Sequence, residues 1–180
     1  MRTIFRIKVI NNSQGVVSRD GKITLDGSSR KKTWPKPRVQ ITGPDSMRPN
    51  FFGNAFSGLV FGESVYNEDY LFGLMEESGE ILELSHPRAK LFLLNITYYP
   101  EPLNEENCVW AKNPATGEMN IIKKFDFDFE RLPYRGFFKL NYDNGVYLAT
   151  DLGNDPQDDF YKWYGHLGFR GLGFEKIWSR

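Results

Sequence analysis

The sequence predicts an α+β fold, a mainly antiparallel β-sheet with one or two helices packed on it. Three observations support this prediction: short segments in which apolar and polar side chains alternate, turn residues between those segments, and one clear amphipathic helix near the C-terminus. A chain of 180 residues favours one domain and buries enough surface to fold without a disulfide or a metal ion. The single cysteine, Cys108, excludes an intrachain disulfide.

The first strands are predicted in the N-terminal part. Residues 4–10 alternate apolar and charged side chains, which is typical of a half-buried strand. Residues 21–27 form a short predicted strand bounded by glycines, and residues 38–42 form another. Residues 28–37 contain a run of three basic side chains and two prolines, so we expect an exposed basic loop there.

The middle of the chain predicts a hairpin and a central strand. Residues 70–75 and 80–84 flank a Glu-Glu-Ser-Gly sequence that is typical of a hairpin turn. For residues 67–73 the sequence is compatible with two conformations, a helical turn or an extended segment. Residues 91–99 are rich in apolar and β-branched side chains and predict a central strand. Residues 43–57 hold prolines, asparagines and glycines, and we expect them to be irregular.

The clearest predicted strand spans residues 119–132. Because a strand points alternate side chains to opposite faces, aromatic rings line one face and carboxylates line the other. The rings belong to Phe125, Phe127 and Phe129, and the carboxylates to Asp126, Asp128 and Glu130. We expect the aromatic face to be buried and the acidic face to be solvated. Neighbours on one face lie about 6.6–7 Å apart, which disfavours one metal ion held by adjacent carboxylates.

The C-terminal part predicts a hairpin, a helix and a last strand. Residues 137–140 and 146–150 are strands joined by a tight turn, because Asn144-Gly145 accepts the positive φ that such turns need. A helix follows Asp155, a suitable capping residue, and residues 172–178 form the last strand. The apolar stripe of this helix consists of Phe160, Trp163, Tyr164 and Leu167.

Positive and negative charges are distributed unequally along a chain whose net charge is zero. Residues 1–50 contain 11 Lys and Arg against 3 Asp and Glu, whereas residues 51–180 contain 12 against 20. We therefore expect a basic N-terminal β segment, 1–57, and an acidic α+β domain, 58–180, although the two can form one compact unit. The acidic part repels phosphate, which argues against nucleic acid as a partner, and it attracts a basic partner.

Catalytic and metal-binding patterns are missing from the sequence. His86 and His166 have no Cys, Ser or Asp at a recognisable catalytic spacing, and Cys108 has no zinc-finger partners. We expect neither an enzyme nor a cofactor. No apolar stretch approaches the roughly 18 residues of a membrane span. Residues 1–8 alternate like a strand and do not resemble a signal peptide, so the predicted location is the cytoplasm and no membrane partner is expected.

Several segments of the C-terminal half follow one another in a fixed order: KLFLLNIT at 90–97, FDFDFERL at 125–132, GFFKL at 136–140 and VYLATD at 146–151. The predicted helix comes next, and the chain closes on GLGF at 171–174 with Ile177 and Trp178. Over roughly residues 80–178 this order resembles immunity protein eleven, a family of bacterial polymorphic-toxin systems. The resemblance implies a non-enzymatic inhibitor that binds a cognate toxin in the producer's cytoplasm. It implies no catalytic residues.

We expect the toxin to bind the acidic C-terminal surface, because carboxylates can take the place of phosphate in the cationic cleft of a nuclease and speed association. The candidate partner-binding residues are Asp126, Asp128, Glu130, Asp151, Asp158 and Asp159. The helix is expected to turn at least one of Asp158 and Asp159 outward. Two alternatives are open: a small-ligand or carbohydrate-binding β-rich module, and a hydrolase whose site forms from distant loops.

Overall fold

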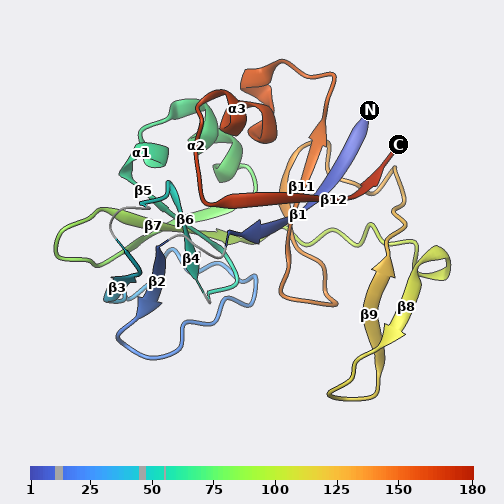
Figure 1. Cartoon of the computed structure of the whole chain (residues 1–180), viewed down its shortest axis with the longest axis horizontal. Helices are drawn as coiled ribbons and strands as arrows, with labels where there is room; N and C mark the ends of the chain where they lie inside the picture. Colours follow the sequence, from blue (N-terminus) through green and yellow to red (C-terminus); the bar gives the residue numbers. More distant parts are fainter. Residues whose placement is uncertain (11–13, 45–47, 55) are drawn as a thin grey trace.

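The computed structural model describes residues 1–10, 14–44, 48–54 and 56–180. Within these ranges it confirms the predicted α+β class (Figure 1). Two larger sheets of four and six strands carry the fold, a separate two-stranded hairpin extends from it, and three short α-helices lie together on one side. The C-terminus and the N-terminus end close to each other at the same side of the four-stranded sheet (Figure 1).

The four-stranded sheet is built from both ends of the chain. Its strand order is β10-β11-β1-β12, and every neighbouring pair is antiparallel. The strands are β1 (Arg2–Val9), β10 (Gly136–Phe138), β11 (Val146–Asp151) and β12 (Leu172–Ser179). β10 and β11 pair as predicted, but the tight turn expected at Asn144-Gly145 is absent, because residues 139–145 connect the two strands and neither Asn144 nor Gly145 has a positive φ. The strand predicted at 4–10 is confirmed as β1, which lies between β11 and β12.

The six-stranded sheet has the order β3-β2-β4-β5-β7-β6. Its strands are β2 (Gly15–Ser18), β3 (Val39–Thr42), β4 (Phe51–Asn54), β5 (Leu59–Gly62), β6 (Gly79–Leu84) and β7 (Leu91–Ile96). The β2–β4 pair is parallel and the other pairs are antiparallel. All residues of β7 are buried, which confirms the central strand predicted there.

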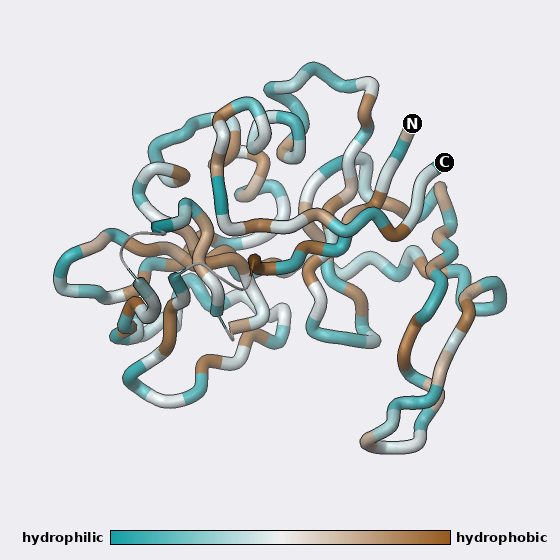
Figure 2. Tube along the Cα trace, in the orientation of Figure 1, coloured by the Kyte–Doolittle hydropathy of each residue, from teal (hydrophilic) through white to brown (hydrophobic). Residues whose placement is uncertain are grey.

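The helices are α1 (Glu63–Tyr66), α2 (Asp69–Glu76) and α3 (Phe160–His166), accompanied by the 3-10 turns η2 (Glu105–Asn107) and η3 (Pro156–Asp158). The described residues form three hydrophobic cores, and alternate residues of one strand belong to different cores. Leu148 of β11 and Leu94 of β7 belong to the group of buried side chains that also contains the helices, whereas Tyr147 and Leu93 face away from it. Figure 2 shows hydrophobic residues gathered along these inner strands.

A projecting hairpin is formed by β8 (Val109–Lys112) and β9 (Met119–Lys124), which pair only with each other among the described strands (Figure 1). The turn sequence between them, Asn113 to Gly117, closes with a hydrogen bond from Gly117 N to Asn113 O at 2.7 Å. A two-stranded hairpin has little stability of its own in water. It therefore depends on its attachment to the body through the residues on either side.

The basic segment 1–57 does not form a sheet of its own. Its first strand, β1, completes the four-stranded sheet, and its other strands join the six-stranded sheet. The expected boundary at 57/58 separates β4 from β5, which are hydrogen-bonded neighbours. The alternative of one compact unit agrees with this pairing. Within residues 43–57, which were expected to be irregular, 45–47 and 55 lie outside the described ranges and β4 is a strand.

Residues 70–75 correct one prediction. They form most of α2 and are not the first strand of a hairpin, so the helical alternative for residues 67–73 is right from Asp69 onward. The buried residues Leu71, Leu74 and Met75 are spaced i, i+3 and i+4, which places them on one helical face. The second predicted strand, at 80–84, is present as β6.

Two other predicted strands are absent or shorter. Residues 21–27 form no strand, although Leu25 is buried among the side chains beneath the six-stranded sheet. The strand predicted at 119–132 ends at Lys124. Beyond it only an isolated bridge between Leu103 and Phe127 remains, and Asp128 then closes a turn by accepting the Glu130 N–H at 3.1 Å.

Candidate functional site

Three of the predicted site residues, Asp126, Asp128 and Glu130, lie together in a hollow of about 860 Å³, which we call the acidic groove. It lies between the segment around η2, the turn after β9 and the end of β12. The lining residues used below are Asn104, Asn107, residues 126–131 and residues 178–180. The groove is thus assembled from three separate parts of the chain.

Burial of two phenylalanines orients the carboxylates. Phe125 and Phe127 are 9% and 3% exposed, and their rings stack with centroids 5.8 Å apart beneath the four-stranded sheet. The backbone stays extended here, so the residues between and after these rings point the opposite way. Asp126 and Asp128 are therefore partly exposed, as predicted, although the segment is not a strand.

The carboxylates of the acidic groove differ in how they are bonded. Asp126 accepts a hydrogen bond from the Asn107 amide at 3.1 Å. Asp128 forms an ion pair with Arg131 at 3.3 Å, in addition to closing the turn described above. Glu130 is exposed, and its carboxylate makes no hydrogen bond or ion pair with any described residue. Glu130 is consequently the carboxylate that a partner can engage with the least loss of internal bonding.

Aromatic rings border this groove, and Arg2 packs on one of them from outside the lining. The Trp178 ring meets Phe127 edge-on at 5.8 Å and is partly exposed. The Arg2 guanidinium lies 4.4 Å from the centroid of the Phe129 ring and donates to the Phe129 carbonyl oxygen at 3.1 Å. The sequence analysis missed Arg2 and Trp178. No sequence signal was available, because only the packing of β1 and β12 brings them to residues 126–131.

The other three predicted site residues, Asp151, Asp158 and Asp159, lie outside the groove. For Asp159 the prediction of a partner-binding role is wrong. Asp151 is bonded to the N-terminal ammonium at 2.9 Å, and the Gly153 N–H together with that ammonium lowers the pKa of its carboxyl. Asp158 is exposed and faces Arg135 at 3.3 Å. Asp159 is only 1% exposed, so it is not available to a partner. Its carboxylate caps α3 by accepting the Lys162 N–H at 3.1 Å.

The cysteine and the histidines are separated in the fold. The Cys108 thiol is buried and contacts the backbone of Asp126, with 3.6 Å to its oxygen and 3.4 Å to its nitrogen. His166 stacks on Trp163 with ring centroids 4.7 Å apart, and His86 lines a different groove. Within the described ranges no group of three or more His, Cys, Asp and Glu side chains is arranged to hold a metal ion.

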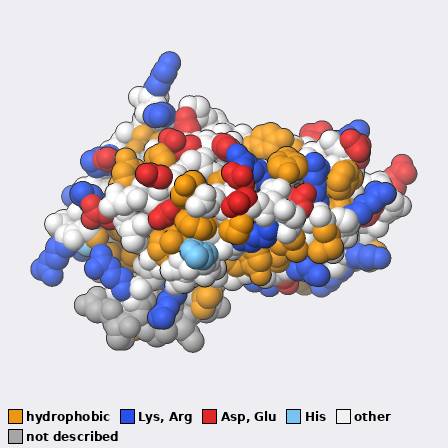
Figure 3. Space-filling model, turned by 90° about the horizontal axis from the view of Figure 1, so that it is seen from above, with side chains coloured by type: hydrophobic (Ala, Val, Ile, Leu, Met, Phe, Trp, Pro, Cys, Tyr) orange, Lys and Arg blue, Asp and Glu red, His pale blue; other side chains and the backbone are white. Residues whose placement is uncertain are grey.

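Charges of both signs share the surface. Figure 3 shows acidic and basic side chains interspersed, with apolar side chains between them, on the face seen from above. Pairing across the fold accounts for part of this mixture, since Arg135 binds Glu77 at 2.7 Å and Lys8 binds Glu175 at 2.9 Å. On this face, the unequal charge of the two sequence halves does not produce a patch of one sign.

No protein-family model matches the chain, and no curated protein matches it significantly. The longest helix of the described residues is α2, and none of the helices there is long and apolar enough to cross a bilayer. A functional conclusion therefore depends on the contacts, burial and charges of the grooves themselves.

Proposed function

We propose that the protein is an immunity protein, a non-catalytic inhibitor that binds a cognate basic toxin in the bacterial cytoplasm through the acidic groove. One observation carries the proposal: three carboxylates and two partly exposed rings, Phe129 and Trp178, border the same hollow. Carboxylates steer a basic partner and set the rate of encounter. Aromatic rings at the centre of an interface supply much of the binding free energy.

The projecting hairpin extends this surface. Val109 and Met119, which are 51% and 55% exposed, present apolar side chains on β8 and β9. The base of the hairpin is joined to the groove, because Asn104 N donates to Asp126 O at 3.0 Å. A partner seated over the carboxylates therefore also reaches the hairpin. Apolar groups beside a charged rim are typical of a transient protein interface.

Charge reversal at Glu130 tests the proposal. The probe is the toxin candidate encoded beside the gene, and the measurement is its association rate with Glu130→Lys at low and high salt. We expect association to slow by about tenfold at low salt, with a smaller loss at high salt where rim charges are screened. Glu76→Lys is the matched control, since Glu76 is an exposed carboxylate at the end of α2, remote from the groove.

The outcomes separate the candidate functions. If Glu130→Lys and Glu76→Lys associate equally fast with the toxin, the acidic groove is not the binding surface. If no protein partner co-purifies and the chain is retained on a sugar column, the carbohydrate-binding alternative replaces the immunity function. Turnover of a chromogenic ester or glycoside by the purified chain would instead favour the hydrolase.

A further inference from the structure

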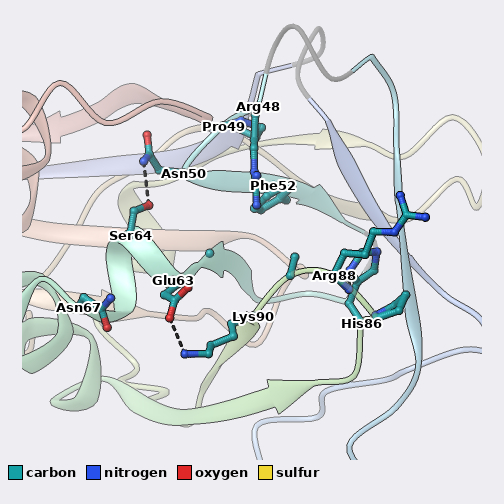
Figure 4. Close-up of a pocket in the computed structure, with 13 residues that line it drawn as sticks. Arg48, Pro49, Asn50, Phe52, Glu63, Ser64, Asn67, His86, Arg88 and Lys90 are labelled. Carbon is teal, nitrogen blue, oxygen red and sulfur yellow. Dashed lines mark hydrogen bonds and ion pairs between the residues drawn. The ribbon is translucent and has the colours of Figure 1, made fainter.

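A second groove, which we call the basic groove, lies beside the six-stranded sheet and has a volume of about 840 Å³ (Figure 4). It is bordered by the segment that enters β4, by α1 and by the loop between β6 and β7. Arg48 comes from the first of these elements, and His86 and Arg88 come from the last. The proposed function leaves this groove without a role.

Two positive charges of the basic groove have no partner among the residues that the structure describes. Arg48 and Arg88 are exposed, and neither guanidinium is hydrogen-bonded or ion-paired with a described residue. Two nearby carboxylates of the described residues are already paired. Glu63 is paired with Lys90 at 2.5 Å, as Figure 4 shows, and Glu83 is paired with Lys36.

Polar groups fix the opposite wall. The Asn50 amide donates to Ser64 Oγ at 3.0 Å (Figure 4), and its carbonyl oxygen accepts the Arg170 N–H at 2.9 Å. Asn50 therefore ties the start of β4 to α1 and to the loop before β12. Asn67 lies further along the same wall (Figure 4). These bonds connect the elements of this wall without using the guanidinium groups of Arg48 and Arg88.

The pKa of His86 is sensitive to the positive charge around this groove. Burial lowers the pKa of His86, and the guanidinium groups of Arg19, Arg88 and Arg48 lower it further. Its Nδ1 accepts the Arg88 N–H at 3.2 Å, so the neutral ring carries its proton on Nε2 and can donate from there. The guanidinium groups of Arg48 and Arg88 and the N–H donor of the His86 ring therefore border the same groove.

We propose that the basic groove binds the oxyanion of a small ligand, a phosphate or carboxylate group, and that Arg48 and Arg88 supply the positive charge at its border. Guanidinium groups present planar, paired donors that match these oxyanions. The volume lies in the range typical of small-molecule sites, about 300–1,000 Å³. A long polyanion is disfavoured, because residues 51–180 carry an excess of acidic side chains that repels an extended phosphate backbone.

This site also gives a role to part of the basic N-terminal segment. Arg30 and Arg38 are already paired with Asp26 and Asp20, at 2.9 Å and 2.6 Å. Arg48, in contrast, has no hydrogen-bond or ion-pair partner within the described ranges and is available to a ligand in this proposal. The proposal does not depend on the acidic groove, since the basic groove is built from β4, α1 and the β6–β7 loop.

The two histidines make a direct test possible. Inorganic phosphate, pyrophosphate and citrate are each titrated at constant ionic strength while the imidazole resonances are followed by NMR. We expect saturable shifts of His86 and a rise in its pKa, because a bound anion offsets the surrounding guanidinium charges. His166, stacked on Trp163, serves as the internal control and should stay unchanged.

Substitutions then locate the site. Arg48→Gln and Arg88→Gln should each weaken binding of the most tightly bound probe by about fivefold or more, the loss expected for a charge-assisted contact. Lys123→Gln removes the same charge from the exposed face of β9 and should leave binding unchanged. All of these side chains are exposed, so the variants are expected to keep the wild-type melting temperature.

Each outcome decides a specific point. Tighter binding of phosphate or pyrophosphate assigns a phosphorylated ligand, and tighter binding of citrate assigns a carboxylate. Linear, unsaturated shifts of His86 with all three probes overturn the proposal. Equal binding by Arg48→Gln, Arg88→Gln and Lys123→Gln overturns it as well. A stronger response to a duplex oligonucleotide than to any small probe would also overturn it, in favour of nucleic acid.

Discussion

The hydroxyl of Thr150 donates a hydrogen bond to the carboxylate of Asp159 in the interior of the protein. Both residues are only 1% exposed. Thr150 belongs to β11 and Asp159 precedes α3, so this bond joins the four-stranded sheet to the helix that covers it. The sequence places Asp158 and Asp159 in equivalent acidic positions. In the tertiary structure Asp158 is exposed to solvent, whereas Asp159 is buried and caps α3.

Replacing Asp159 should destabilise the protein far more than replacing Asp158. Asp159→Ala removes the cap of α3 and leaves the buried Thr150 hydroxyl without its partner, which together cost about 2–3 kcal/mol. Asp158→Ala loses only an exposed ion pair with Arg135 and should change the free energy of unfolding by less than about 0.5 kcal/mol. Urea unfolding measures both. Similar losses for the two variants would contradict the assignment of Asp159 as the cap.

The aromatic pair under the acidic groove should be essential for stability. Phe127→Ala is expected to cost about 3–5 kcal/mol, because the ring is enclosed between Phe125 and Trp178. Asp126→Ala should cost about 1 kcal/mol, since it loses one partly exposed hydrogen bond to Asn107. Urea unfolding of both variants at one protein concentration is the measurement. Equal small effects would show that Phe127 is not part of the core.

A buried lysine gives the stability a dependence on pH. Lys139 is 1% exposed, with its ammonium 6.0 Å from the centroid of the Tyr99 ring. Burial lowers the pKa of Lys139, although Asp143 partly opposes this shift. The unfolded chain therefore binds more protons than the native protein between the native pKa and the unfolded value of about 10.4. In that window the free energy of unfolding contributed by Lys139 rises with pH.

Lys139→Met should therefore stabilise the protein by about 1 kcal/mol near neutral pH, because it removes the cost of burying a charge. This advantage over wild type should shrink as the pH approaches about 10. Melting temperatures of both proteins across this range give the difference. The pKa of Tyr142 is raised to about 12 by its hydrogen bond to Glu105, so Tyr142 lowers the free energy of unfolding as the pH rises above about 10. Because both proteins contain Tyr142, this effect cancels in the difference between their melting temperatures. A pH-independent difference would rule out titration of Lys139.

Removal of metal ions and thiol reduction should leave folding unchanged. The only cysteine, Cys108, is buried against the backbone of Asp126, and the hydrophobic cores have no need of a crosslink. Melting curves with and without a chelator, and with and without a reductant, should coincide. A shift of more than about 5 °C, which corresponds to roughly 1 kcal/mol of stability, would reveal a bound metal or a redox contribution.

Features with a local cause were predictable from the sequence. The alternation of residues 4–10 depends on neighbouring residues and is present as β1. The two strands on either side of Asn144-Gly145 are also paired, although residues 139–145 connect them in place of the predicted tight turn. The burial of Phe125 and Phe127 was also predictable, because side chains alternate along any extended backbone. Phe129, expected on the same buried face, is instead partly exposed, because the chain turns after Asp128. Residues 70–75 were harder, since Tyr70 and Phe72 favour a strand whereas the spacing of the buried leucines favours a helix. The helix forms because it packs Leu71, Leu74 and Met75 into the core, which outweighs the strand propensity of the aromatic residues.

The sequence by itself determined the fold class, most of the strands, and the place of three carboxylates beside buried rings, since these follow from side-chain period and turn chemistry. Only the tertiary structure decided which charges are free. Asp159 is buried and bonded to Thr150, whereas Arg48 and Arg88 border one groove with His86 although they come from distant segments. Contacts of this kind depend on how distant segments pack together. The separation of two residues along the chain does not specify whether they come together in the folded protein.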